Sequence, residues 1–202
     1  MSASKPVILG VLAMAAIVVA SNILVQHLVG DWLTWGAFTY PFAFLVTDLT
    51  NRAHGPRAAR LVVAAGFAAG VACSFVAAGL GATTFRIALG SGLAFLTAQM
   101  LDVALFDRLR RGAWWRAPLA SSVIGSALDT ALFFSVAFAG ALAFLAPGDD
   151  VSWANAAVPL LGMGPEAPLW ISLALADFAV KLGLALAALA PFRALSRRFA
   201  AA

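Results

Sequence analysis

Long apolar stretches alternate with short polar connections along the whole chain. Residues 6–30 and residues 61–85 contain no charged side chain, and about 20 apolar residues are enough for a helix to cross a bilayer. Segments of alternating polarity, which are typical of membrane β-barrels, are absent. The pattern therefore predicts an all-α, polytopic membrane protein with six spans, at about residues 7–29, 33–51, 61–82, 84–106, 117–146 and 168–192.

The predicted connections differ in charge between the two sides of the membrane. Eleven of the 13 lysine and arginine residues fall before the first span, after the last span, or in the second and fourth connections. They are Lys5, Arg52, Arg57, Arg60, Arg108, Arg110, Arg111, Arg116, Arg193, Arg197 and Arg198. Cytoplasmic loops collect such cations, so we predict that both ends of the chain lie in the cytoplasm. All six tryptophans lie near predicted span ends, as in an interfacial belt.

The first apolar stretch also has features of a cleavable signal peptide. Residues 7–20 have a suitable length, and Val18 and Ala20 form the small-residue pattern that precedes a cleavage site. The apolar run continues through Val25, beyond a cut after Ala20, which favours a membrane span. We find no repeat, linker or second domain and expect residues 1–202 to form one domain.

Composition excludes an ordinary soluble protein. Hydrophobic residues make up 63% of the chain and charged residues 11%, whereas soluble domains carry about 25% charged residues. The isoelectric point near 10.2 is also found in nucleic-acid-binding proteins. Here the cations occupy the connections of a membrane protein, so we expect lipid and not nucleic acid as a partner. The single cysteine, Cys73, is interpreted as a packing residue.

Motifs for catalysis and cofactor binding are missing from the sequence. It contains no phosphate-binding loop, no H-E-x-x-H zinc motif and no G-x-S-x-G nucleophile motif. His27 and His54 are expected near opposite membrane faces, which makes them a poor metal-binding pair. We therefore predict that the chain is not an enzyme and has no catalytic residue, metal or cofactor.

Charged residues inside the predicted spans are the strongest functional signal. Asp177 and Lys181 lie in the middle of the sixth span at an i, i+4 spacing, so they can neutralise each other. Asp129 lies near the middle of the fifth span, with no cation at i±3 or i±4. Asp48 and Asp102 lie in the inner thirds of the second and fourth spans. A charge at the bilayer centre costs at least ~2.5 kcal/mol, so such residues normally face a cavity or a partner.

Each of these residues also has a purely structural interpretation. Asp177 and Lys181 can neutralise each other within the sixth span, so they need no other charged partner. Asp48 and Asp102 are near enough to predicted helix ends to approach the headgroups. Asn22 and Gln26 share one face of the first span and are equally suited to hydrogen bonds between helices.

A run that begins near the second span resembles a known signature. Trp35-Gly-Ala-Phe-Thr-Tyr-Pro-Phe-Ala-Phe-Leu-Val-Thr-Asp-Leu-Thr-Asn-Arg52 is similar to the second-helix signature of the queuosine precursor transporter family, formerly grouped as putative vitamin uptake transporters. Shorter similarities occur in the expected order along the chain, at Ser21-Asn22, Gln99-Met-Leu-Asp102, Trp114-Trp115-Arg-Ala-Pro118, Gly125, Asp129-Thr130 and Asp177-Phe-Ala-Val-Lys181.

The chain departs from this family pattern in two places. Family members often carry polar residues between the fifth-helix glycine and the Asp-Thr pair, whereas Ala127 and Leu128 are apolar here. The connection at 147–167 is long and rich in proline and glycine, so we expect it to be irregular. These departures concern the fine shape of the site more than the family.

The resemblance implies import of 7-cyano-7-deazaguanine or its aminomethyl relative, bases salvaged for queuosine in tRNA, across a bacterial inner membrane. By analogy of fold alone, it suggests the six-helix substrate-binding subunits of energy-coupling-factor vitamin transporters, and a homodimer is compatible with it. The base presents an N–H and an amino group side by side, and we expect Asp129 to accept both. The other expected substrate contacts are Asn22, Gln26, Gln99, Asp102, Thr130, Asp48, Phe38, Tyr40 and Phe42, with Asp177 and Lys181 as a gating or structural ion pair.

Two other functions stay open on the sequence. The first is a substrate-binding subunit that needs a separate ATPase module, which transport by the purified protein alone in liposomes would distinguish. The second is an intramembrane enzyme built on Asp48, Asp102 and Asp129. Against it, Asp129 is predicted nearer the membrane centre than the other two, and no protease motif joins the three residues.

Overall fold

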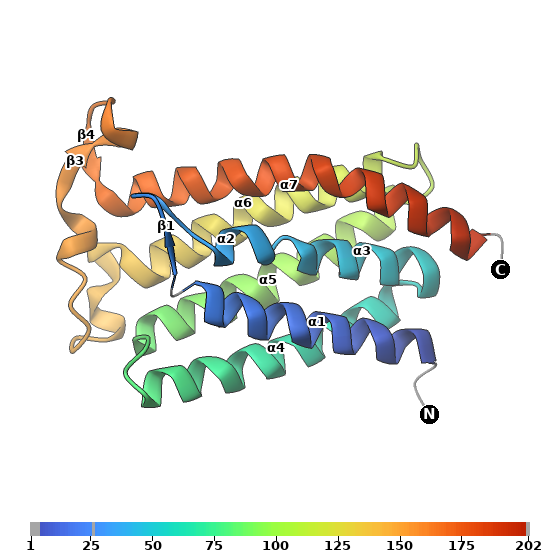
Figure 1. Ribbon diagram of the computed structural model, residues 1–202, viewed down its shortest axis with the longest axis horizontal. Helices are drawn as coiled ribbons and strands as arrows, with labels where there is room; N and C mark the ends of the chain where they lie inside the picture. Colours follow the sequence, from blue (N-terminus) through green and yellow to red (C-terminus); the bar gives the residue numbers. More distant parts are fainter. Residues whose placement is uncertain (1–4, 26, 201–202) are drawn as a thin grey trace.

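The fold is a bundle of helices that run along one long axis (Figure 1), and the structure, a computed structural model, describes residues 5–25 and 27–200. The α-helices are α1 (Lys5–Leu24), α2 (Gly36–Thr39), α3 (Phe42–His54), α4 (Pro56–Gly79), α5 (Phe85–Leu109), α6 (Arg116–Phe138) and α7 (Leu169–Ala200). One end of the bundle carries the antiparallel strand pairs β1 (Leu28–Val29) with β2 (Leu33–Thr34) and β3 (Ala157–Pro159) with β4 (Glu166–Pro168). The short 3-10 helices η1 (Gly140–Leu145), η2 (Trp153–Asn155) and η3 (Leu160–Gly162) lie at the same end.

Five helices in the described residues, α1, α4, α5, α6 and α7, are long and apolar enough to cross a membrane. The chain is therefore a polytopic membrane protein, as the hydrophobic pattern predicted. The large side chains of Leu9 and Leu12 in α1 and of Phe75 in α4 are each more than half exposed. Apolar surface of this extent needs a lipid environment, because soluble monomers rarely expose large apolar patches.

The second predicted span, at 33–51, is divided into the short helices α2 and α3. Pro41 has no backbone N–H, so the α-helical hydrogen-bond ladder is interrupted there. Bonds of the i→i+3 type, from Ala43 N to Tyr40 O (2.9 Å) and from Phe44 N to Pro41 O (3.2 Å), join the two helices. α2 and α3 follow one another along the bundle axis (Figure 1).

The end of α6 also differs from the prediction, because the helix stops at Phe138 and not near residue 146. The Asn155 side chain accepts a hydrogen bond from Gly140 N (3.0 Å) and donates one to Phe138 O (2.8 Å). The guanidinium of Arg86, which is fully buried, donates to Ala139 O. These contacts satisfy carbonyl groups that a helix end leaves without partners, and they come from distant parts of the chain.

Two further boundaries were misplaced. α1 ends at Leu24, before the predicted residue 29, because the chain turns into the strand pair β1–β2. α7 continues to Ala200, past the predicted end at 192, although Pro191 lies inside it.

α3 lies in the middle of the bundle, where it packs against α1, α4, α5, α6 and α7. Around it, α1 packs on α4, α4 on α5, α5 on α6, and α6 on α7. Small residues allow the close approach of α1 and α4. A Cβ atom added at Gly66 would collide with Met14, and one at Gly70 would stand 3.0 Å from Val18 Cγ1.

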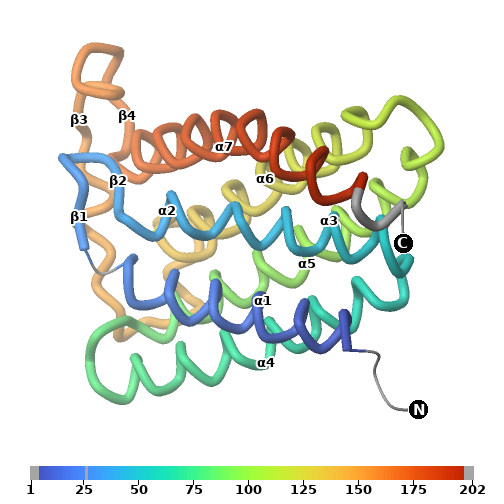
Figure 2. The backbone as a smooth tube through the Cα atoms, turned by 45° about the vertical axis from the view of Figure 1, so that its right-hand side comes forward, coloured from blue at the N-terminus to red at the C-terminus, as the bar shows by residue number. Residues whose placement is uncertain are grey.

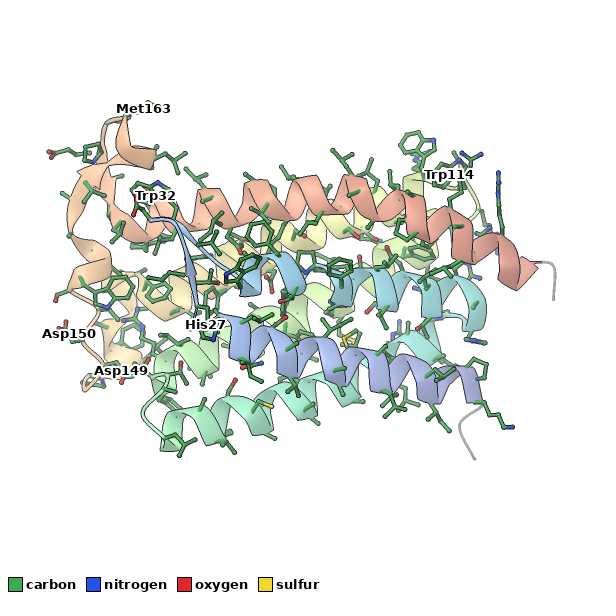
Figure 3. All side chains as sticks on the ribbon, in the orientation of Figure 1. His27, Trp32, Trp114, Asp149, Asp150 and Met163 are labelled. Atoms are coloured by element: carbon green, nitrogen blue, oxygen red, sulfur yellow. The ribbon has the colours of Figure 1, made fainter. Side chains whose placement is uncertain are left out.

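The two ends of the bundle differ in charge. The start of α1, the junction of α3 and α4, the junction of α5 and α6, and the last turns of α7 lie together at the end opposite the strand pairs (Figure 2). We name this the cation-rich end, since the arginines of the α3–α4 and α5–α6 junctions and of the last turns of α7 lie there. Trp32 lies at the strand end and Trp114 at the cation-rich end (Figure 3), as expected of tryptophans at the two membrane interfaces.

Candidate functional site

The centre of the bundle holds a group of polar residues, which we name the central cluster: Asp129, Thr130 and Lys181 are buried, and Tyr40 and Asp177 are partly buried. Lys181 Nζ on α7 lies 2.7 Å from Asp129 Oδ2 on α6 and 2.5 Å from Asp177 Oδ2 on its own helix. Tyr40, at the break between α2 and α3, donates a hydrogen bond from Oη to Asp129 Oδ1 at 3.3 Å. Asp129 is 3% exposed and Lys181 4%, so water hardly screens these contacts.

Thr130 completes the central cluster by bonding to both Asp177 and Lys181. Its hydroxyl donates to Asp177 Oδ2 (2.8 Å) and accepts a hydrogen bond from Lys181 Nζ (3.0 Å). One ammonium group thus faces two carboxylates, which leaves one negative charge uncompensated when all three are ionised. Such an excess is costly in a buried place. The cluster therefore favours a ligand that presents hydrogen-bond donors.

The position of Lys181 confirms one prediction and adds a contact that the sequence did not reveal. Its contact with Asp177 is the predicted i, i+4 pair of the sixth span. Asp129 has no cation at i±3 or i±4 on its own helix, but Lys181 reaches it from 52 residues further along the chain. No spacing within α6 reveals a partner on α7.

Two narrow cavities border the central cluster. The Asp48 cavity is lined, among others, by Phe44, Asp48, Ser122, Ser126, Lys181 and Phe192. The Asn22 cavity is lined, among others, by Asn22, Tyr40, Phe67, Ser74, Ser91 and Phe95. Lys181 thus lines one cavity and Tyr40 the other, and both residues contact Asp129.

Both cavities are too small for a purine-sized molecule in this structure. The space open to the centre of a water molecule is about 10 Å³ in the Asp48 cavity and 20 Å³ in the Asn22 cavity. About one water molecule fits into such a space. A larger solute therefore needs a movement of the surrounding side chains or helices.

A second buried polar group lies where α3, α5 and α6 meet. Asp48 on α3 is 2% exposed and Asp102 on α5 is 0% exposed; we name them the carboxyl pair. Asp48 accepts hydrogen bonds from Ser121 Oγ (3.3 Å) and Ser122 Oγ (3.4 Å). Neither oxygen of Asp102 meets hydrogen-bond geometry with any group in the described residues. The burial of both residues argues against the helix-end interpretation.

Gln99, one of the predicted substrate contacts, joins α5 to α3. Its Oε1 accepts a hydrogen bond from Thr47 Oγ1 at 2.7 Å. One helical turn further on, Asn51 Nδ2 donates to Val103 O at 3.0 Å. These two contacts fix the register of α3 against α5 and place the carboxyl pair between them.

Comparison with known proteins agrees with the predicted family. Residues 34–195 match the family described as "Putative vitamin uptake transporter". The chain belongs to this family. The central cluster and the carboxyl pair fall within the matched residues, whereas α1 with Asn22 precedes them. A transporter family agrees with the prediction that the chain is not an enzyme.

Three relatives carry a more specific name. The chain is 39% identical over 141 residues to the queuosine precursor transporter of Escherichia coli, which covers 60% of this chain and 64% of that protein. It is 39% identical over 121 residues to a probable queuosine precursor transporter of Haemophilus influenzae, over 52% of each chain. A probable queuosine precursor transporter of Bacillus subtilis is 32% identical over 137 residues, or 56% of this chain and 60% of the relative. The chain thus spans about half to two thirds of the length of these curated relatives. No solved structure matches it.

The departure from the family pattern in α6 lies away from the central cluster. Ala127 is exposed and Leu128 is partly exposed, whereas Asp129 and Thr130 are buried. Ala127 and Leu128 are therefore not part of the buried face of α6 that carries Asp129 and Thr130. The irregular connection predicted at 147–167 is confirmed, since it contains only short strands and 3-10 turns.

The remaining predicted contacts are scattered. Asn22 lines the Asn22 cavity, donates from Nδ2 to Val18 O (2.9 Å) and accepts from Ser74 Oγ (3.3 Å). Gln26 lies outside the described residues. Phe38 packs against the Trp35 ring, and Phe42 is 46% exposed; neither lines one of the two cavities.

Some cavity residues escaped sequence reasoning although a signal for them existed. Ser122 and Ser126 line the Asp48 cavity, and with Asp129 they follow the 3–4-residue spacing of one helix face. Phe95, whose ring centroid lies 5.9 Å from that of Tyr40, has no such signal. In the described part of the chain, no three His, Cys, Asp or Glu side chains are arranged to hold a metal ion.

Proposed function

We propose that this chain imports queuosine precursors, 7-cyano-7-deazaguanine or its aminomethyl relative, through the inner membrane of a bacterium. The observation that carries the proposal is the central cluster, a largely buried group with an excess of negative charge that borders two cavities. The family and the names of the three relatives support the choice of substrate. An intramembrane enzyme has no comparable support, because the family is one of transporters.

Asp129 is the proposed reader of the guanine-like edge. Its Oδ2 is held by Lys181 at 2.7 Å, whereas its Oδ1 has the longer bond, 3.3 Å, to Tyr40. A substrate that displaces the Tyr40 hydroxyl gains acceptor sites on the carboxylate while the ion pair stays intact. Thr130 and Asn22 are further proposed contacts, and Tyr40 with the nearby Phe95 supplies the aromatic surface. The gating or structural role of the ion pair then consists of holding Asp129 in place.

The other predicted contacts receive different assignments. Gln99 and Asp102 lie at the α3–α5 interface and line neither cavity, so we propose no direct substrate contact for them, whereas Asp48 lines the cavity that the substrate enters after the central cluster. Phe38 and Phe42 are left out because they line neither cavity.

We propose six spans, with α2 and α3 together forming a broken second span. The break lies at Tyr40 and Pro41, and the Tyr40 hydroxyl contacts Asp129. Gathering of arginines at the cation-rich end supports an orientation with both chain ends in the cytoplasm. The Asn22 cavity then lies in the outer half of the bundle and the Asp48 cavity in the inner half, and import moves the base from one to the other past the central cluster.

Uptake by the purified protein in liposomes tests the proposal. Labelled 7-cyano-7-deazaguanine should enter the liposomes without any second protein, and its unlabelled aminomethyl relative should compete. Binding without uptake would favour the alternative of a substrate-binding subunit that needs an ATPase module. Absence of binding would show that the proposed substrate is wrong. Light scattering of the purified protein in detergent gives its oligomeric state, for which we expect a homodimer.

A further inference from the structure

The interface between α3 and α5 contains buried polar atoms whose hydrogen-bonding capacity is unused. The contacts Thr47–Gln99 and Asn51–Val103 hold the interface together. Gln99 Nε2 and Asn51 Oδ1, at the other ends of the same amide groups, have no partner in the described residues. Both residues are fully buried. The interface thus presents an unused donor and an unused acceptor on either side of the carboxyl pair.

Asp102 is a further buried residue whose hydrogen-bonding capacity is unused. It is 0% exposed, and both of its carboxyl oxygens lack a hydrogen-bond partner in the described residues. A protonated carboxyl group both donates and accepts, whereas a carboxylate only accepts. Protonated Asp102 therefore offers one hydrogen-bond donor as well as an oxygen that accepts. A bound metal cation could interact with acceptor oxygens only, and would leave the donor Gln99 Nε2 without a partner.

Among the described residues, no cation forms a salt bridge with either member of the carboxyl pair. α6 contributes the hydroxyls of Ser121 and Ser122 and, further along the helix, Asp129. α7 contributes Lys181, which shares the Asp48 cavity but is already bonded to two carboxylates. α1 and α4 pack apolar side chains against α3. Two buried carboxylates that lack a counter-ion do not both ionise, because each charge disfavours the other.

We propose that the carboxyl pair binds one proton and releases it in each transport cycle, so that import is coupled to the proton gradient. This inference rests on the proposed function and adds its driving ion. The proton binds to a carboxylate oxygen of the pair from the outer aqueous phase and leaves to water on the cytoplasmic side. Asp48 and Lys181 line the same cavity, so a movement that opens this cavity exposes the proton site together with the central cluster.

Wild-type protein in liposomes provides the first test. Exchange of labelled for unlabelled 7-cyano-7-deazaguanine at equal pH measures transport without a driving gradient. An outside pH one unit below the inside pH should then raise accumulation up to ~10-fold, since one pH unit corresponds to a factor of ten in proton activity. A pH-sensitive dye inside the liposomes should report acidification when substrate is added. Exchange without acidification or gradient-driven accumulation would overturn the inference while leaving the proposed function standing.

Absence of exchange would instead refute the proposed function, and the inference with it. Accumulation driven by a sodium gradient at equal pH would also overturn the inference, since it would identify a metal cation as the coupled ion. The dye signal needs no variant, so it decides the question even where a substitution impairs folding.

Substitutions assign the proton to the carboxyl pair. The readout is the ratio of uptake with the pH gradient to uptake without it, which a loss of folded protein alone does not change. Asp102→Asn and Asp48→Asn place a neutral group at the site, so this ratio should fall from ~10 to about 1. Asp107→Asn is the matched control, because Asp107 lies on the same helix but is 43% exposed in a surface pair with Arg110. An unchanged ratio in both Asp102→Asn and Asp48→Asn would overturn the assignment.

Discussion

Lys181 contacts two carboxylates at once, so its removal should affect stability differently from the removal of one member of an isolated ion pair. A self-contained pair of Asp177 and Lys181, as the sequence suggested, would be neutral, and removing both residues would leave nothing unbalanced. In the structure the ammonium also holds Asp129 at 2.7 Å. Removing Lys181 therefore leaves two carboxylates side by side, whereas removing Asp177 leaves one balanced pair.

We expect Lys181→Met to destabilise the protein by roughly 3–5 kcal/mol, the cost of breaking a buried ion pair from one side. Asp177→Asn should cost less than ~1 kcal/mol, because the Lys181–Asp129 contact stays and an amide still accepts from Thr130. The double variant Asp177→Asn/Lys181→Met should be less destabilised than Lys181→Met but less stable than wild type, because one carboxylate, and not two, is left without a cation. Thermal unfolding in detergent measures the three, and a double variant as stable as wild type would show that Asp129 does not depend on Lys181.

Asp129→Asn should weaken binding of 7-cyano-7-deazaguanine by ~10-fold to a few hundred-fold. Hydrogen bonds to a charged group contribute about 1.5–3 kcal/mol, and asparagine turns an NH₂ toward a donor of the substrate. Equilibrium binding in detergent is the suitable measurement, because it requires no proton gradient and so separates recognition from coupling.

An analogue without the exocyclic amine sharpens this comparison. Wild type should strongly prefer the natural base, and Asp129→Asn should lose most of that preference. Asp150→Asn serves as the control, since Asp150 is exposed in the connection before α7 and should leave binding unchanged. Unaltered affinity and preference in folded Asp129→Asn protein would refute the role of Asp129.

Sequence reasoning named every member of the central cluster but not their arrangement. Asp129, Asp177 and Lys181 stood out because charges are rare inside membrane spans. Their grouping depends on how α6 packs against α7, and no spacing along one helix contains that information. The burial of the carboxyl pair stayed open for a similar reason, because distance from the predicted helix ends does not show which face of α3 turns inward.

At the scale of elements, glycine controls how closely α1 and α4 approach. Gly66→Ala should destabilise the protein by about 1–3 kcal/mol, since the added methyl group collides with Met14 in a packed contact. Gly79→Ala, at the end of the same helix with open space around it, should be neutral or slightly stabilising. Thermal unfolding of both variants measures the difference. Equal stability of the two would mean that α1 and α4 do not pack as described.

The long helices were predicted well and the interrupted ones poorly. Uncharged runs of sufficient length identified α1 and α4 directly, because length and hydrophobicity alone define a span. Pro41 was visible within the second predicted span, yet hydrophobicity does not show whether a proline kinks a helix or divides it. The end of α6 depends on Asn155 and Arg86, which are distant in sequence, so the apolar residues beyond Phe138 were wrongly assigned to the helix.

At the scale of the whole molecule, the clustering of arginines at one end predicts the orientation. Reporters fused after Arg57, Arg111 and Arg198 should report the cytoplasm, and one inserted near Gly148 should report the outside. Arg57 and Arg111 belong to the helix junctions at the cation-rich end, whereas Gly148 follows η1 at the strand end. A cytoplasmic signal at Gly148 would mean that the number of spans between Arg111 and Gly148 is even, which contradicts a single crossing by α6.

The central position of α3 has a consequence for biogenesis. A chain is made from its N-terminus, so α3 leaves the ribosome before α5, whose Val103 O accepts from Asn51, and before α6, whose Ser121 and Ser122 donate to Asp48. An aspartate at the centre of a membrane helix costs about 2.5–3.5 kcal/mol during insertion, and α3 has only 13 residues. We therefore expect a cysteine introduced into the α2–α3 segment of a Cys73→Ala chain to stay accessible to water-soluble thiol reagents when the nascent chain is truncated after α4, and to become protected once α5 and α6 have been synthesised.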